Sequence, residues 1–243
     1  MLKRPWLLVG LALAALAFII GIRFITPRSD LLLPPRASNG AEYVLYVHVP
    51  DRCRSGGCPA LYLLDGGRWL PTFTQITETL AARQAMAPVV LVGIGYRAIP
   101  GVAPQRQRDF AAGADAYIAA LQSDIIPFAR SHLPISAACG IVGNGDAASF
   151  AAYALTHAPD TFDSYLIINP SAAPPAPFTP STRPHTISLA AARASMPWMH
   201  QLGAALLSDP KLTVSQNLYP SKTGDAIVEP AAIAALPTLF PGE

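Results

Sequence analysis

Five consecutive residues, Gly143-Asn144-Gly145-Asp146-Ala147, join an apolar segment to an expected helix, and this setting is typical of a nucleophile elbow. In the elbow pattern G-x-S-x-G, a strained turn lifts a serine above the sheet, and the helix N-terminus stabilises the negative charge that develops during acyl transfer. This sequence keeps the leading glycine, Gly143, but has Gly145 where the pattern has serine. Because glycine has no side chain, acyl-enzyme chemistry cannot start at that position.

Four other side chains could supply a displaced nucleophile. If the register slips by one residue, the carboxylate of Asp146 takes the apex, although aspartate also caps helix N-termini very commonly. Ser149 and Ser171 carry hydroxyls, but neither has an elbow setting or a plausible base. Asp65 begins a second turn, Asp65-Gly66-Gly67, directly after an apolar segment. Since α/β sheets carry function beyond the carboxyl ends of their strands, we expect chemistry at these turns.

The elements that would position these residues alternate along the chain. Strand-like apolar segments cover residues 42–49, 60–64, 88–96, 138–142, 164–168, 185–190 and 212–219. Helical spacing covers residues 70–84, 111–132 with an interruption near Pro127, 146–157, 197–207 and 228–239. Residues 97–110 are expected to form a loop, and residues 169–184 an irregular segment. The alternation predicts an α/β fold, with a mostly parallel sheet and helices on both faces.

Composition and charge exclude several classes of protein. The chain has 243 residues and a formal net charge of +2, and its length suits one α/β domain with a full core. Lysines and arginines are scattered rather than grouped into the basic stripe that a phosphate backbone needs, so nucleic acid is not an expected partner. No cysteine and histidine pairs lie at ligand spacing, so neither a metal nor a cofactor is expected.

The 3 cysteines divide into a close pair and a single residue. Cys53 and Cys58 flank Arg-Ser-Gly-Gly, a spacing that could close a small disulfide loop in an oxidising compartment. The pair could equally be two free thiols at a hairpin tip, because short loops often miss disulfide geometry. Cys139 lies in a strand-like apolar segment and is expected to be a buried small hydrophobe.

The N-terminal segment predicts a membrane anchor. Residues 6–22 form an unbroken apolar run, at the short end of the length that spans a bilayer, with basic residues on both sides. A cleaved signal peptide would need small residues at a cleavage site after the run. The only Ala-x-Ala patterns lie inside it and are followed by Phe18-Ile19-Ile20, so a retained anchor is favoured. The flanking charges and the cysteine pair favour a single-pass protein of the bacterial inner membrane, with its domain facing the periplasm.

The order of these segments resembles the putative-esterase family of α/β-hydrolases, which includes esterase D and the enterochelin (siderophore) esterases. The similar stretches are residues 62–66, 90–96, 106–110, 124–128, the turn at 143–147, and 168–171. They occur in family order over residues 43–174, and the last third of the chain matches less clearly. The resemblance implies an α/β-hydrolase-like domain over residues 41–243, after an anchor over residues 1–25 and a linker over residues 26–40.

The sequence departs from this family at all three positions of the catalytic triad. The family's elbow reads Gly-His-Ser-x-Gly-Gly, whereas this chain has Asn144, Gly145, Ala147 and Ala148 at the second, third, fifth and sixth places. The family's histidine follows the last strand, where the stretch around Gly224 contains none. Its acid would lie between residues 185 and 197, which include no carboxylate. The resemblance therefore implies a degenerate catalytic site.

The same resemblance indicates where a ligand could bind. In the family, the backbone near Gly66 and Gly67 supplies half of the oxyanion hole, although a turn explains these glycines equally well. Arg106 and Arg108 match a segment near the mouth of the site, where they could hold an anionic ligand or form structural ion pairs. Asp65 belongs to the same candidate set.

Three functional hypotheses follow from the sequence. The first is a membrane-tethered esterase-like protein that lacks the triad and binds a ligand or a protein partner in the cell envelope. The second is an active hydrolase of carboxylesters or siderophore lactones with a displaced nucleophile. The third is a structural subunit of an envelope or secretion complex, in which the fold serves only for docking.

Overall fold

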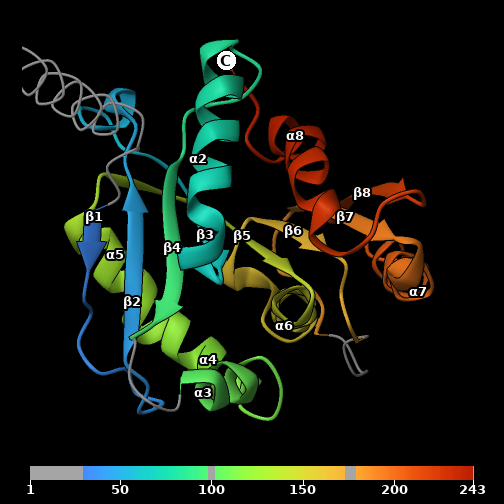
Figure 1. The fold of residues 1–243 in the computed structure, drawn as a ribbon, viewed down its shortest axis with the longest axis horizontal. Helices are drawn as coiled ribbons and strands as arrows, with labels where there is room; N and C mark the ends of the chain where they lie inside the picture. Colours follow the sequence, from blue (N-terminus) through green and yellow to red (C-terminus); the bar gives the residue numbers. More distant parts are fainter. Residues whose placement is uncertain (1–29, 98–101, 173–178, 243) are drawn as a thin grey trace, which may run out of the picture.

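The computed structural model describes residues 30–97, 102–172 and 179–242, and its centre is one sheet of eight strands (Figure 1). The strands are β1 (Asp30–Leu32), β2 (Tyr43–His48), β3 (Cys58–Leu64), β4 (Val90–Tyr96), β5 (Ile135–Asn144), β6 (Ser164–Ile168), β7 (His185–Ala192) and β8 (Leu212–Tyr219). Their order across the sheet is β1-β2-β4-β3-β5-β6-β7-β8. Strands β3 to β8 pair in parallel, whereas β2 pairs antiparallel with both β1 and β4. This mostly parallel sheet fits the predicted α/β-hydrolase fold.

Helices cover both faces of the sheet, as the alternation predicted (Figure 1). One face packs against α2 (Gly66–Ala82) and α8 (Val228–Leu239), and the other against α4 (Ala114–Ala120), α5 (Ile126–His132), α6 (Asp146–His157) and α7 (Met196–Leu206). Successive side chains of a strand point to opposite faces, so Leu61 and Leu63 join the core under α2, whereas Tyr62 joins the core under α6. Burial on both faces explains why the central strands are continuously apolar.

Most elements lie close to their predicted bounds, and β6, β8, α6 and α8 begin and end at the predicted residues. The predicted helix over residues 111–132 is interrupted as expected: α4 passes through a π-helical turn at Leu121–Ile125 into α5. Pro127 lies one residue inside α5. Proline lacks the N–H that a regular α-helix uses, and the widened turn carries the chain past it.

The prediction of a linker over residues 26–40 is wrong for residues 30–32, whereas residues 33–40 contain no helix or strand. Asp30–Leu32 forms β1, whose Leu32 pairs with Leu45 of β2. Pro34 and Pro35 indicated a linker because proline cannot donate to a sheet, but the leucines just before them add a short edge strand.

The prediction of a loop over residues 97–110 is wrong for residues 102–109, and residues 98–101 lie outside the described residues. Within it, α3 spans Val102–Asp109. The segment lacks the apolar periodicity that identifies a helix in sequence. Tertiary contacts anchor it, because Arg106 binds Asp65 and the buried carboxylate of Asp109 accepts the hydroxyl of Tyr43 at 2.7 Å.

Both cysteine sites have a definite state in the structure. Cys53 and Cys58 are joined in a disulfide, which selects one of the two alternatives that the spacing left open. Cys139 is free and buried in β5, and burial raises the pKa of its thiol. The disulfide closes the loop that leads into β3, next to the start of β5.

The predicted anchor, with its apolar run over residues 6–22, lies outside the described residues. Within the described ranges, no helix combines the length and the apolar character that crossing a bilayer requires. Anchoring and orientation therefore stay predictions.

Candidate functional site

The turn between β5 and α6 has the geometry of an elbow with glycine at its apex. Gly145 adopts φ 66° and ψ −124°, a conformation that residues with a side chain rarely adopt. A Cβ on Gly143 would lie 2.3 Å from the carbonyl oxygen of Ala147, so only glycine allows the helix to approach the strand this closely. A Cβ on Gly145 would meet nothing within 4 Å among the described residues. The sterically demanding glycine is therefore Gly143, not Gly145.

Positive backbone φ angles recur at the ends of the neighbouring strands. Asp65 follows β3 with φ 54°, and Asn169 follows β6 with φ 50°, on either side of the apex at φ 66°. A left-handed conformation costs roughly 1–2 kcal/mol in a residue other than glycine. Such strain gathers at functional sites and is held by the surrounding structure. Three adjacent strands thus end in strained backbone at the carboxyl edge, where α/β sheets carry function.

On one side of the apex, Arg106 joins two carboxylates. Its Nε and Nη2 donate to the two carboxylate oxygens of Asp65 at 2.7 and 2.8 Å, and its Nη1 lies 3.5 Å from Oδ2 of Asp146. The guanidinium carbon also lies 4.8 Å from the ring centre of Phe110. The hydrogen bonds to Asp65 raise the pKa of Arg106, so its charge is fixed. The fold therefore brings three sequence candidates together: Asp65, Arg106 and Asp146.

Two candidate serines lie next to this group. The hydroxyl of Ser171 donates to Oδ1 of Asp146 at 2.6 Å, and it lies 3.1 Å from the hydroxyl oxygen of Ser149. Oγ of Ser149 also accepts the backbone N–H groups of Ser171 and Ala172, each at 2.9 Å. Ser149 thus ties the segment after β6 to α6, whereas Ser171 has a carboxylate partner.

On the other side of the apex, a second polar group reaches the elbow from the loop after β8. Nδ2 of Asn144 donates to Oδ1 of Asp225 at 2.7 Å, and Arg68 forms an ion pair with the same carboxylate. Oδ1 of Asn144 is buried and has no hydrogen-bond partner among the described residues. Nδ2 of Asn169 donates to the carbonyl of Gly224 at 2.8 Å. These contacts hold the loop around Gly224 against the elbow.

Three further sequence candidates have packing or ion-pair partners. A Cβ on Gly66 would lie 2.2 Å from the backbone of Gly93, where α2 crosses β4, and one on Gly67 would lie 3.1 Å from the ring of Tyr46. Arg108 donates from Nε and Nη2 to Oδ1 of the buried Asp109, at 2.9 and 2.7 Å. Close packing therefore requires glycine at Gly66, and Arg108 forms a structural ion pair.

The histidines lie on other parts of the fold. His48 ends β2, His132 ends α5, His157 ends α6, His185 begins β7 and His200 lies within α7. Among the described residues, none of them hydrogen-bonds a residue of the elbow. No group of three or more metal-ligating side chains is found in the described part of the chain either.

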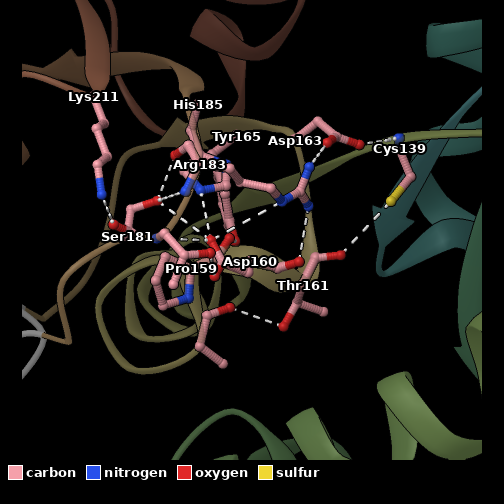
Figure 2. Close-up of polar contacts among 12 residues, drawn as sticks. Cys139, Pro159, Asp160, Thr161, Asp163, Tyr165, Ser181, Arg183, His185 and Lys211 are labelled. Atoms are coloured by element: carbon pink, nitrogen blue, oxygen red, sulfur yellow. Dashed lines mark hydrogen bonds and ion pairs between the residues drawn. The ribbon is translucent and has the colours of Figure 1, made fainter.

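A second polar cluster lies at the opposite, amino edge of the sheet, and it contains a serine, an aspartate and a histidine (Figure 2). Oδ1 of Asp160 lies 3.3 Å from the hydroxyl of Ser181 and 3.2 Å from Nε2 of His185, which is buried. A catalytic triad needs histidine between the serine and the acid. Here the acid lies between the other two, and Nδ1 of His185 has no partner within the described residues. The arrangement cannot relay a proton from serine to histidine.

Instead, hydrogen bonds and ion pairs of this cluster, called the clasp below, link the loop before β7 to the turn before β6. Thr182 donates its hydroxyl and its N–H to Asp160. Arg183 pairs with Asp163 (Figure 2). Hydrogen bonds from Thr182 lower the pKa of Asp160, and burial lowers the pKa of His185. The cluster therefore holds a charged Asp160 beside a neutral His185, as structural groups.

Sequence reasoning missed several members of the elbow group. Arg68 and Asp225 were not among the candidates, although each lies close in sequence to a predicted turn at the carboxyl edge, and Asn169 belonged to the turn at 168–171 without a role of its own. Asp225 follows Gly224, in the stretch where the family pattern has its histidine. A search of all strand-end loops for charged side chains of either sign would have found Arg68 and Asp225.

Comparison with known proteins places this geometry in a family context. The model of the family described as "Putative esterase" matches residues 37–229. Among curated proteins, the ferri-bacillibactin esterase BesA of Bacillus subtilis (strain 168) is 23% identical over 191 residues. The match covers 68% of this chain and 66% of BesA, just under two thirds of that protein's length.

Solved structures share the fold at low identity. The BES protein from Bacillus cereus superposes with a TM-score of 0.74 and 18% identity, covering 89% of this chain and 96% of that chain. The siderophore hydrolase EstA from Aspergillus nidulans gives a TM-score of 0.68 and 18% identity, over 86% of this chain and 93% of that chain. The enterobactin esterase FES from Shigella flexneri, in the presence of enterobactin, gives a TM-score of 0.70 and 19% identity. This match covers 88% of this chain and 59% of that chain.

Proposed function

This chain belongs to the Putative esterase family, and on that premise we propose that it is a member that binds a ligand or a partner without hydrolysing an ester. The observation that carries the proposal is Gly145 at the apex of the elbow, in the conformation φ 66° and ψ −124°. At this position the fold presents a nucleophile to the substrate, and glycine has none to present. The elbow therefore keeps its shape without its nucleophile.

The surroundings of the apex support the same proposal. The loop after β8, where the family has its histidine, places the carboxylate of Asp225 next to Asn144 instead. A carboxylate that is already engaged by Asn144 and Arg68 does not replace the imidazole that the family pattern has here. Residues 185–197, where the acid is expected, contain no carboxylate. Serine, acid and histidine are all absent from the positions that the family pattern assigns to them.

The ligand that this proposal favours is an ester or lactone of the siderophore class, because the matched relatives are esterases and hydrolases of siderophores. One feature of the elbow suits a hydrogen-bonding ligand: the charged guanidinium of Arg106, whose side chain is 34% exposed. Instead of a small ligand, the domain could bind a protein partner in the cell envelope, and the fold would then serve only as a docking surface.

The same proposal includes a membrane tether. Residues 1–25 would anchor the chain in the bacterial inner membrane, with residues 41–243 in the periplasm. The Cys53–Cys58 disulfide supports an oxidising compartment. Protease added to intact spheroplasts should degrade the domain while a cytoplasmic control protein survives. Protection of the domain would contradict this orientation.

Catalysis is tested with a fluorophosphonate probe and short p-nitrophenyl esters on the full-length protein. We expect no covalent labelling and no turnover above a denatured control. Gly145→Ser should also be inactive, because no histidine follows the last strand. Stoichiometric labelling of the wild-type protein would overturn the proposal, and turnover by Gly145→Ser would show that a base and an acid are still in place.

Binding is tested separately, with enterobactin as the probe and tryptophan fluorescence as the readout. Arg106→Gln should weaken binding by about tenfold, the effect of losing a charge-assisted hydrogen bond. Arg108→Gln is the matched control, because Arg108 binds Asp109 and not the elbow. Equal effects of the two substitutions would argue against a ligand site at the elbow.

One observation favours the alternative of a displaced nucleophile. The hydroxyl of Ser171 donates to Asp146 at 2.6 Å, so attack on an ester carbonyl could pass its proton to that carboxylate. The leaving alcohol would then take up the proton, and water would release the acyl group. The carboxylate of Asp146 already pairs with Arg106, and no histidine lies beside Ser171 among the described residues, so we rank this alternative second. If the wild-type protein turns over esters and Ser171→Ala abolishes turnover while Ser149→Ala does not, this alternative is correct.

A further inference from the structure

A cavity of about 390 Å³ lies near the amino edge of the sheet, where β7 and β8 begin. Its walls come from the end of α6, the segment before β7, the end of α7 and the turn into β8. Apolar side chains make up much of the lining: Leu155, Pro159, Pro180, Ala205, Leu206 and Leu212. Cavities of this size with mostly apolar walls are typical of sites for small molecules.

The cavity is remote from the elbow. The carbonyl of Lys211, which lines the cavity, accepts the N–H of His185 at 3.1 Å, at the very start of β7. The elbow lies beyond the opposite ends of the strands. A strand of 8 residues such as β7 spans roughly 25 Å. A ligand in this cavity therefore leaves the elbow free.

One unpaired cation lies at the rim. The ammonium of Lys211 donates to the carbonyl of Ser181 at 2.7 Å and forms no ion pair within the described residues. Figure 2 shows its side chain reaching Ser181 from the turn that leads into β8, apart from the carboxylates of Asp160 and Asp163. An ammonium has three N–H donors, so two remain available. The hydroxyl of Ser181 donates to the carbonyl of Arg183, and Arg183 donates to the carbonyl of Asp160. These bonds hold the segment whose Ser181 carbonyl orients the ammonium of Lys211.

The second charged group of the rim is Asp209. Its Oδ1 accepts the backbone N–H of Lys211 at 2.9 Å and so shapes the turn into β8, while other acceptor sites of the carboxylate stay open. The rim is thus neutral in formal charge, and both of its charged groups keep free hydrogen-bonding capacity. The carboxylate of Asp209 is tied to the backbone of its own turn, whereas the ammonium of Lys211 stands on a flexible stem and can turn toward an anionic head group.

We propose that this cavity binds an amphipathic carboxylate, with its alkyl part against Leu155, Leu206 and Leu212 and its carboxylate on the ammonium of Lys211. The proposal is independent of the function assigned to the elbow, because it uses none of the residues there. It assigns the protein a second ligand site on the opposite edge of the sheet.

The test uses a photoreactive octanoate analogue and the full-length protein, with the labelled peptides mapped by mass spectrometry. Label should appear in residues 155–159 or 205–212. Octanoate should compete about tenfold more strongly than octanol or octylamine, which share its tail but not its charge. The relative strength of the three competitors measures the preference for a head group. It does not depend on how the photoreactive probe partitions into detergent.

Variants then locate the charge preference. Lys211→Met should remove the advantage of octanoate, whereas Lys211→Arg should keep it. Lys222→Met is the matched control, because Lys222 is exposed on the turn after β8 and does not line the cavity. The melting temperature of each variant shows whether it is folded.

Three results would overturn the proposal: label confined to other peptides, competition by octylamine as strong as by octanoate, or a preference that survives in folded Lys211→Met. Preference for octylamine that is lost in Asp209→Asn would assign the rim to a cation instead. None of these results affects the fluorophosphonate or enterobactin experiments, so the two proposals can fail separately.

Discussion

The two edges of the sheet carry similar side chains, which differ in exposure and in how they are paired. At the carboxyl edge, Arg106 and Arg68 pair with carboxylates that remain partly exposed, around a glycine at the apex of the elbow. At the amino edge, Asp160, Ser181 and His185 have the residue types of a triad, yet the histidine is buried and the acid lies between the other two.

The difference shows that residue types identify a catalytic site only together with their position on the fold. In parallel sheets the loops at the carboxyl ends converge on helix N-termini, where developing negative charge is stabilised. The amino edge lacks that setting, so the same side chains become a clasp between loops. In this protein, the carboxyl edge has glycine at the apex of its elbow. At the amino edge, the aspartate lies between the serine and the histidine.

The comparison is tested most strongly within the elbow itself. Gly143→Ala should destabilise the protein by about 3 kcal/mol or more, because its Cβ would overlap the carbonyl of Ala147. Gly145→Ala is the matched control, with a cost of about 1–2 kcal/mol from backbone strain alone. Urea unfolding followed by circular dichroism measures both. Equal effects would mean that the elbow is not as tight as described.

The next largest effect should separate the two edges. Asp160→Asn should cost about 2–3 kcal/mol, because it leaves donors from Ser181, Thr182 and His185 poorly satisfied. Asp225→Asn at the elbow should cost about 1 kcal/mol or less, since its ion pair with Arg68 is exposed. The same unfolding measurement compares them. A larger loss in Asp225→Asn would reverse the assignment of structural and functional edges.

A smaller effect is expected at the bidentate pair of the elbow. Arg106→Lys should lower the unfolding free energy by about 0.5–1 kcal/mol, because lysine cannot make two parallel hydrogen bonds to Asp65. Differential scanning fluorimetry of wild type, Arg106→Lys and Arg97→Lys, an exposed pair elsewhere, detects it. A loss as large as that of Asp160→Asn would show that Arg106 holds the fold together.

The mildest test is pH. Burial lowers the pKa of His185 below its ordinary value of 6.5, so the folded state disfavours the protonated form. Stability should be complete above that value and should fall as the pH drops from 6.5 toward the lowered folded pKa. The charge of Asp160 is retained in that window, because its pKa is lowered from 3.8.

His185→Gln should flatten this part of the profile of melting temperature against pH, whereas His200→Gln, on the exposed side of α7, should not. A profile that His185→Gln leaves unchanged would show that another group titrates.

The sequence predicted much of the fold because the central strands are buried on both faces and therefore continuously apolar. The elbow was predictable as well, since a strand and a helix meet there through small residues. The strand β1 and the helix α3 were not, because each is short and is held by partners distant in sequence, such as Asp65 for Arg106. Local periodicity carries no information about such partners.

The sequence by itself determined that residue 145 has no side chain and that no histidine follows the last strand. Only the tertiary structure decided that Arg106 faces the elbow while Arg108 turns to Asp109, and that His185 joins Asp160 at the opposite edge. Which residue type stands at a position is a local property, and the sequence states it directly. Pairing depends on which loops the sheet order brings together, and that order is fixed by packing over the whole domain.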